Sequence, residues 1–204
     1  MALNPNVRNI FRNAFEQKCF QLINEAYLSS LNEKVIQLNW NENDISQEIL
    51  EKIERNTLRL KWNITASREF YLPNNDFKSK GFADKLSRID FRLTNIFAEQ
   101  EFKYFIEAKR LKENDSELKR AYINEGMERF ISKKYPIGCM LGYLLEGNIG
   151  KTIKGINKLL VKDKRKTETL IFKKHIQFNA YYESNHSKIG ILKHIIFDFT
   201  SISS

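Results

Sequence analysis

Two apolar segments of the chain each carry one acidic residue at a position where a metal ion could bind. Residues 89–93 read Ile-Asp-Phe-Arg-Leu and residues 105–109 read Phe-Ile-Glu-Ala-Lys, and the alternation of apolar residues predicts a strand in each. Side chains alternate between the faces of a strand, so Glu107 and Lys109 share a face, and Asp90 points away from the face of its apolar neighbours. If the strands pair, these three residues converge. Two carboxylates bind a hard divalent cation, and a lysine beside it stabilises developing phosphoryl charge, which is the chemistry of phosphodiester hydrolysis.

The order of these residues resembles the signature of the PD-(D/E)XK nuclease superfamily, in which an Asp is followed by Glu-x-Lys after a hairpin-length gap. Glu107 follows Asp90 by 17 positions, which leaves room for a hairpin with a short loop around residues 95–103. Ile89 stands where the pattern of the superfamily has a proline. The resemblance covers roughly residues 42–143, and this segment looks similar to small bacterial defence or restriction-type nucleases.

The resemblance implies a restriction-endonuclease-like fold, which is an α/β mixed sheet flanked by helices. It also implies Mg²⁺-dependent endonucleolytic cleavage of DNA, with Mn²⁺ as a substitute. In this scheme Asp90 and Glu107 bind the metal and the Ala108 carbonyl joins them. Lys109 orients the attacking water or neutralises the charge that develops at phosphorus.

The superfamily usually adds an acidic residue from the helix that precedes the first strand. Glu42 and Glu48 both lie near a predicted helix that starts at Asp44 as its N-cap residue. We favour Glu42 as the residue that supports the metal, because it lies where a helix end could meet the strands. Either residue could instead be an ordinary solvated side chain.

The Glu-x-Lys triplet is informative only in its context. Residues 117–119 repeat it as Glu-Leu-Lys in a polar stretch without a strand pattern. The alternative for residues 105–109 is a solvated hairpin with a surface Glu–Lys pair, which contributes little. The apolar residues 104–106 before the triplet favour the site, and so does Asp90, because aspartate is disfavoured inside strands.

The net charge of +9 favours a polyanionic partner, and nucleic acid is the commonest one. The alternative is a basic protein without such a partner. The candidate nucleic-acid contacts are Arg129, Lys133, Lys151, Lys154 and Lys158. Each set of basic residues could equally be a solvated helix face.

The first two of these contacts lie in a predicted helix over residues 122–134. Tyr122, Gly126, Arg129 and Lys133 share one face of it at three- and four-residue steps. A glycine is unfavourable inside a helix, so Gly126 indicates a close approach of the backbone to a neighbour.

Apolar periodicity predicts most of the secondary structure. We expect helices over residues 7–31, 44–55, 122–134 and 149–161, strands over residues 58–64, 89–93, 105–109, 137–145, 171–182 and 191–199, a turn at 73–76, and polar loops at 77–86 and 112–119. This order fits a mixed sheet flanked by helices, preceded by an N-terminal amphipathic helix.

The 204 residues, of which 42% are hydrophobic, predict one domain with a core of its own and a helical extension. We place the extension at residues 1–38, and the resemblance implies a nuclease-like domain over residues 39–204. Cys19 and Cys139 lie in apolar surroundings and are expected to be buried free thiols. The N-terminal residues have no signal-like apolar region, and no apolar run approaches membrane-spanning length, so the cytoplasm is the expected compartment.

The expected partner is double-stranded DNA, and cleavage of both strands suggests a homodimer or a partner protein that supplies specificity. The sequence leaves open whether the substrate is DNA or RNA. Two further alternatives are a non-catalytic nucleic-acid-binding module and a protein that acts through its Phe-rich N-terminal helix.

Overall fold

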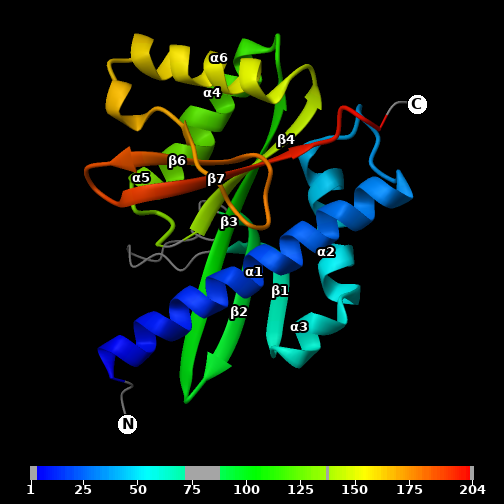
Figure 1. The fold of residues 1–204 in the computed structure, drawn as a ribbon, viewed down its shortest axis with the longest axis vertical. Helices are drawn as coiled ribbons and strands as arrows, with labels where there is room; N and C mark the ends of the chain where they lie inside the picture. The colour runs from blue at the N-terminus through cyan, green and yellow to red at the C-terminus, as the bar shows by residue number, and fades with distance from the viewer. Residues whose placement is uncertain (1–3, 72–87, 137, 203–204) are drawn as a thin grey trace, which may run out of the picture.

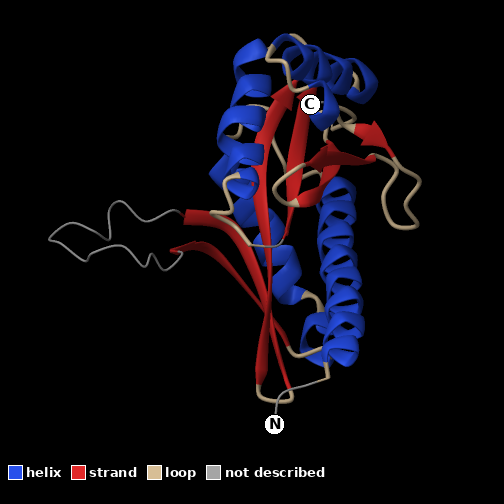
Figure 2. Cartoon of the chain, turned by 90° about the vertical axis from the view of Figure 1, so that its left-hand side faces the viewer, coloured by secondary structure: helices blue, strands red, loops and turns tan. Residues whose placement is uncertain are grey.

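The computed structural model describes residues 4–71, 88–136 and 138–202. The predicted turn at 73–76 and loop at 77–86 lie outside these residues. The described chain forms one mixed sheet of seven strands in the order β1-β2-β3-β4-β7-β6-β5, with helices packed on both faces (Figure 1, Figure 2). The predicted α/β class is therefore confirmed.

The helices are α1 (Pro5–Glu33), α2 (Glu42–Arg55), α3 (Thr57–Lys61), α4 (Ser116–Ala121), the π-helix η2 (Tyr122–Met127), α5 (Glu128–Ile131), α6 (Ile149–Lys162) and the 3₁₀ turn η3 (Lys166–Glu168). The strands are β1 (Ile64–Tyr71), β2 (Arg88–Phe97), β3 (Gln100–Lys112), β4 (Gly138–Glu146), β5 (Ile171–Phe172), β6 (Tyr181–His186) and β7 (Gly190–Asp198).

The sheet combines an antiparallel meander with a parallel centre. β1, β2 and β3 pair antiparallel, whereas β3, β4 and β7 run parallel to one another. Parallel neighbours need a crossover connection, and α4, η2 and α5 form the one between β3 and β4. This crossover lays η2 and α5 over the part of β3 that carries Glu107 and Lys109.

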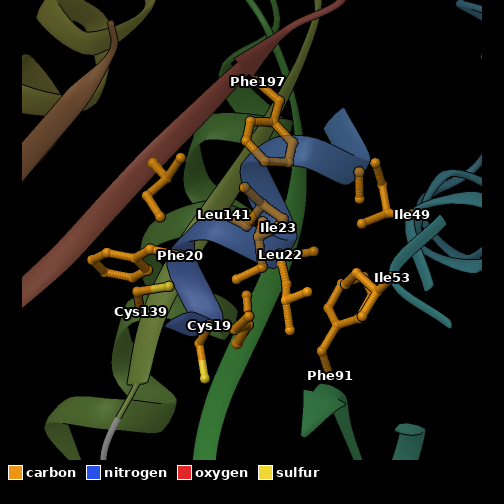
Figure 3. Packing of buried hydrophobic residues seen from close by; sticks show 14 of the residues in the cluster. Cys19, Phe20, Leu22, Ile23, Ile49, Ile53, Phe91, Cys139, Leu141 and Phe197 are labelled. Atoms are coloured by element: carbon orange, nitrogen blue, oxygen red, sulfur yellow. The ribbon is translucent and has the colours of Figure 1, made fainter. Parts of the chain in front are cut away.

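The N-terminal helix packs within the main hydrophobic core of the sheet. Cys19, Phe20, Leu22 and Ile23 of α1 are buried in one cluster with residues of α2, β2, β4 and β7 (Figure 3). Cys139 joins this cluster, and both cysteines are free and buried, as predicted. Among the described residues, no helix is long and apolar enough to cross a membrane.

The start of α2 differs from the prediction by three residues. Asn41 is the N-cap, because its side chain accepts a hydrogen bond from the Asp44 N–H at 3.0 Å and the Asp44 carboxylate accepts one from the Asn41 N–H. Asp44 is therefore the third residue of a capping box. Glu42 consequently lies in the first turn of the helix.

The predicted strand over residues 58–64 is wrong. Asn56 caps a short helix, α3, by accepting a hydrogen bond from the Leu58 N–H at 2.9 Å. The strand begins only at Ile64, after Asn63 has reversed the chain with a φ of 52°. Alternation over a few residues does not distinguish a strand from one turn of helix.

The hairpin between β2 and β3 is tighter than predicted. The strands extend to Phe97 and from Gln100, so that Ala98 and Glu99 alone form the turn, with φ values of 49° and 61°. A two-residue hairpin with a type I′ turn needs positive φ at both positions, and Asn-Gly is the usual signal for it. Ala-Glu carries no such signal, which explains the predicted loop at 95–103.

The segment between β3 and β4 also departs from the prediction. The expected loop at 112–119 contains the start of α4, for which the Asp115 side chain accepts a hydrogen bond from the Leu118 N–H. The expected helix over 122–134 is interrupted by η2 and ends with α5 at Ile131. A π-helix bonds five residues back instead of four, which changes the directions of its side chains.

The other elements agree more closely with the prediction. β4 is the central strand of the sheet, as expected for residues 137–145, and α6 matches residues 149–161. The predicted strand over residues 171–182 is instead two short strands, β5 and β6.

Candidate functional site

A cluster of charged side chains forms where β2 and β3 part. The paired register of the two strands ends with Phe91 opposite Ile106. Asp90 precedes Phe91 on β2. There the Asp90 carboxylate replaces the backbone hydrogen bond between the strands, because its Oδ2 accepts a hydrogen bond from the Ala108 N–H at 2.7 Å. A carboxylate inside a strand is therefore accommodated by an amide that the neighbouring strand has left free.

Glu42 reaches the same strand from the first turn of α2. Its Oε2 accepts a hydrogen bond from the Arg110 N–H at 3.2 Å, and its Oε1 accepts one from Lys109 Nζ at 2.7 Å. One turn further along the helix, Ser46 and Tyr143 share a buried hydrogen bond of 2.9 Å that joins α2 to β4. This bond holds the start of α2, and with it Glu42, against the sheet.

Lys109 lies at the centre of the cluster. Its ammonium group contacts Glu42 at 2.7 Å, the Ala108 carbonyl oxygen at 2.9 Å and Glu107 Oε1 at 3.0 Å. Burial acts to lower the pKa of Lys109, but Glu107, Glu42 and Asp90 outweigh it and raise that pKa above its ordinary value. Lys109 therefore remains a cation near neutral pH and donates protons to hydrogen bonds rather than accepting them.

Glu107 is the most deeply buried charged group of the cluster, with a solvent exposure of 0%. Its Oε1 accepts hydrogen bonds from Lys109 and from Arg129 Nη1, whereas its Oε2 is buried without a hydrogen-bond partner. Burial and the negative charge of Asp90 raise the pKa of Glu107 to about 7, against the opposing effect of Lys109 and Arg129. The carboxyl group is therefore partly protonated near neutral pH.

Glu42 and Lys109 are accessible from an open cleft of about 290 Å³, which is also lined by Asn41, Arg110 and Glu125. Burial raises the pKa of Glu42, and the charge of Lys109 acts against this rise. The cleft gives a polar ligand a path to one side of the buried cluster.

The structure thus brings together the residues that sequence reasoning placed at the site: Asp90, Glu107, Ala108, Lys109 and Glu42. Of the two candidates on α2, Glu42 contacts the cluster, whereas Glu48 pairs with Lys52 at 3.3 Å. Glu42 is therefore the α2 candidate that lies at the cluster, and its role toward a metal ion stays a prediction.

Arg129 also joins the cluster, but the predicted face of basic residues does not form. Arg129 Nη1 bonds to Glu107 and to the Tyr135 hydroxyl at 3.0 Å. Tyr122 is instead buried and shares a hydrogen bond of 2.9 Å with His194, and Lys133 is exposed in the turn after α5 with a φ of 62°. The π-helix η2 changes the direction of Tyr122 relative to Arg129, and the end of α5 at Ile131 removes Lys133 from the helical face.

Gly126 confirms the expected close approach. A Cβ atom at this position would lie 2.3 Å from Met140 Cε and 3.4 Å from Lys109 Cγ. Glycine therefore lets η2 pack directly against the strands beside Lys109.

Tyr135 was missed by sequence reasoning. It is buried, it accepts a hydrogen bond from Arg129, and the guanidinium carbon of Arg129 lies 5.8 Å from the centre of its ring. Tyr135 follows the end of α5 and belongs to no periodic pattern, so the sequence offers no signal for this role.

The second basic set lies on α6, away from the buried cluster. Lys151, Lys154 and Lys158 are all exposed along this helix, and Lys151 Nζ lies 3.5 Å from Glu113 Oε1. α6 covers one end of the sheet above α4 (Figure 1). The set is therefore accessible to a polyanion, and none of its described contacts joins it to Glu107.

Whether a metal ion fits this site depends on the ligand atoms that the protein provides. Within residues 4–71, 88–136 and 138–202, no group of three or more His, Cys, Asp or Glu side chains is arranged to hold a metal ion. Glu42 and Glu107 both face the Lys109 ammonium, and Asp90 faces the Ala108 N–H.

Two features nevertheless fit a divalent cation. The Glu107 Oε2 atom is buried without a hydrogen-bond partner, and the negative charge of Asp90 acts on the same carboxyl group. Carboxylate oxygens of this kind are the ligands that Mg²⁺ prefers, and a cation between them would relieve their repulsion. Asp90 and Glu107 are therefore the residues that could hold one.

No family model, no curated protein and no solved structure matches the chain. The chemistry of the site is therefore inferred from its own residues.

We predict that Glu107 makes the metal-free protein less stable as the pH rises. Its pKa is about 7 in the folded protein and 4.5 ordinarily, so the folded state holds the proton more tightly than the unfolded state. The resulting stability is fully present below pH 4.5 and is lost as the pH rises to about 7.

The test compares urea unfolding of the wild type and Glu107→Gln, in a chelating buffer, at about pH 5 and about pH 8. The variant should gain roughly 2 to 3 kcal/mol relative to the wild type between these values. A difference between the two proteins that does not change with pH would show that the buried carboxylate is not electrostatically disfavoured.

Proposed function

We propose that the protein is a divalent-metal-dependent nuclease with a restriction-endonuclease-like arrangement, similar to PD-(D/E)XK enzymes. The observation that carries the proposal is the convergence of Asp90, Glu107, Lys109 and Glu42 from three different elements on one largely buried cluster. Burying charged groups is unfavourable unless they are paired or bind a metal ion, and such clusters are frequent at functional sites. The alternative of a surface hairpin with a solvated Glu–Lys pair does not fit the structure, because Glu107 is fully buried.

Asp90 and Glu107 are the proposed ligands of Mg²⁺ or Mn²⁺, and the Ala108 carbonyl is a third candidate donor. A divalent cation at this position supplies activation of water and neutralisation of charge on the phosphate.

Lys109 is proposed to act on the charge that develops in the transition state. Because its pKa is raised by Glu107, Glu42 and Asp90 despite burial, it stays protonated and cannot serve as a general base. It can orient the attacking water by donating a hydrogen bond, or neutralise the phosphoryl oxygens. Glu42, which holds Lys109 at 2.7 Å, is then a positioning residue for this ammonium group.

The proposed substrate is nucleic acid, and double-stranded DNA is the form we favour. The net charge of +9 and the exposed lysines of α6 support a polyanionic partner. A partner protein is the proposed source of sequence specificity. A homodimer would provide one site for each strand.

A second candidate is a non-catalytic nucleic-acid-binding module. The specific observation in its favour is that Lys109 neutralises both Glu42 and Glu107 at hydrogen-bonding distance, so that the cluster is largely satisfied by the protein itself. Under this alternative the carboxylates only hold Lys109 in place, and the wild type would bind DNA without cutting it.

The test of the nuclease function is nicking of supercoiled plasmid in Mg²⁺ or Mn²⁺. We predict that Asp90→Asn lowers the rate by orders of magnitude, because it removes a metal ligand. Glu42→Gln should lower it by roughly 10- to 100-fold, as expected for a residue that positions another. Circular dichroism would verify that each variant is folded.

Glu48→Gln is the matched control, since Glu48 lies on the same helix and pairs with Lys52. It should nick as fast as the wild type. A wild type that binds DNA or RNA but cleaves neither would favour the binding module, and full activity of Asp90→Asn would refute the metal ligands proposed here.

We also predict that the α6 lysines bind phosphates without reading bases. Each phosphate contact contributes roughly −0.9 to the slope of log affinity against log salt for duplex DNA. Changing Lys151, Lys154 and Lys158 together to Gln should therefore flatten this slope by up to about 2.7, with little change in sequence preference. The Asp90→Asn background keeps the DNA intact during the titration.

The control removes three exposed lysines from other elements, Lys34, Lys61 and Lys188, and so loses the same formal charge. A salt slope that changes equally in both triple variants would mean that net charge alone matters. A slope that changes in neither would mean that DNA is held elsewhere.

A further inference from the structure

The Glu107 carboxylate is held by two cations that differ in their surroundings. Lys109 is only 7% exposed, and it also contacts the Glu42 carboxylate and the Ala108 carbonyl oxygen. If Lys109 lost its contact with Glu107, two oxygen partners would remain. Lys109 is therefore a fixed part of the cluster.

Arg129 approaches Glu107 from α5, in the crossover that covers β3. Its Nη1 bonds to Glu107 Oε1 at 2.5 Å and to the Tyr135 hydroxyl at 3.0 Å. The Arg129 side chain is 32% exposed, whereas the Glu107 side chain is not exposed at all. Arg129 is thus the one of the two cations with substantial access to solvent and to a ligand.

The Arg129 guanidinium group can bind either of two anions at such a site, a carboxylate or a phosphate. Its planar fork of N–H groups matches a carboxylate or a phosphate with two parallel hydrogen bonds. Glu107 provides a single oxygen to Arg129, because the bond involves Oε1 alone and Oε2 has no hydrogen-bond partner. A phosphodiester that offers two oxygens would be a better partner than this.

A cation bonded to the Glu107 carboxylate repels a second cation at the same carboxylate. Two cations at hydrogen-bonding distance from the same carboxylate repel each other, and a partly exposed site screens this repulsion only in part. A guanidinium group bonded to Oε1 therefore disfavours a divalent ion on the same carboxylate. Its departure would make Glu107 a stronger metal ligand.

We propose that Arg129 couples nucleic-acid binding to metal loading, an inference that rests on the proposed nuclease function. In the free protein Arg129 neutralises Glu107. When a phosphodiester enters the site, the guanidinium turns to the phosphate and releases Glu107 to bind the divalent cation. Coupling of two ligands is reciprocal, so the metal also tightens nucleic-acid binding by the same factor.

The experiment is a calorimetric titration with Ca²⁺ of the full chain, alone and saturated with a short DNA duplex. The wild type should bind Ca²⁺ roughly tenfold more tightly when the duplex is present, within the usual range for coupled sites. Arg129→Gln should bind Ca²⁺ more tightly than the wild type without DNA, and the duplex should then improve its affinity less.

Arg120→Gln is the matched control. It loses the same charge from α4, where Arg120 pairs with Asp163, and it should titrate like the wild type. Arg129→Met removes both the charge and the hydrogen bond, whereas Arg129→Gln can retain the hydrogen bond, so comparing the two separates these effects. Circular dichroism on both variants verifies that they are folded.

Two negative outcomes are distinguishable. If Arg129→Gln and Arg129→Met bind Ca²⁺ with the affinity of the wild type in the absence of DNA, the coupling is refuted and the metal site stands. If Glu107→Gln does not weaken the Ca²⁺ binding of the wild type, the ion lies elsewhere, and the proposed nuclease site is refuted together with the coupling.

Discussion

The buried carboxylate of Glu107 is the group around which the rest of the site is arranged. A charge without access to water must be paired, or it takes up a proton. Lys109 and Arg129 supply the pairing, yet burial and Asp90 still raise the pKa of Glu107 to about 7. The start of α2 and the crossover over β3 both bring charged groups to this point. Gly126 allows η2 to pack directly against the strands beside Lys109. The arrangement is costly for stability, and such costs are characteristic of sites that bind or react.

Much of the fold follows from local pattern. The alternation around Asp90 and before Glu107 identifies the two strands of the site, and the long apolar run of β4 identifies the centre of the sheet. The failures also have local causes. A short alternating stretch was a turn of helix capped by Asn56, and Ala98 with Glu99 formed a tight turn without a glycine or asparagine. In the first case a local cap outweighed the alternating pattern, and in the second a tight turn formed without the residues that usually mark it.

The site itself was predictable where it depends on local pattern. Glu107 and Lys109 share a face because strands have a period of two, and this rule needs no knowledge of the rest of the chain. The contact of Glu42 with Lys109 joins residues 67 positions apart, so the sequence could offer only a choice between Glu42 and Glu48. Arg129 was found on a helical pattern that ends early: α5 stops at Ile131 and Lys133 has a φ of 62°, so Lys133 does not accompany Arg129. Tyr135 depends wholly on packing.

The central claim is that a divalent cation binds between Asp90 and Glu107, and anomalous diffraction from crystals grown with Mn²⁺ tests it most directly. The account predicts a manganese peak in contact with oxygens of both carboxylates, with Lys109 still bonded to Glu42 beside it. A site without manganese, in which Asp90 still accepts from the Ala108 N–H and Glu107 remains bonded to Lys109 and Arg129 at saturating Mn²⁺, would contradict it.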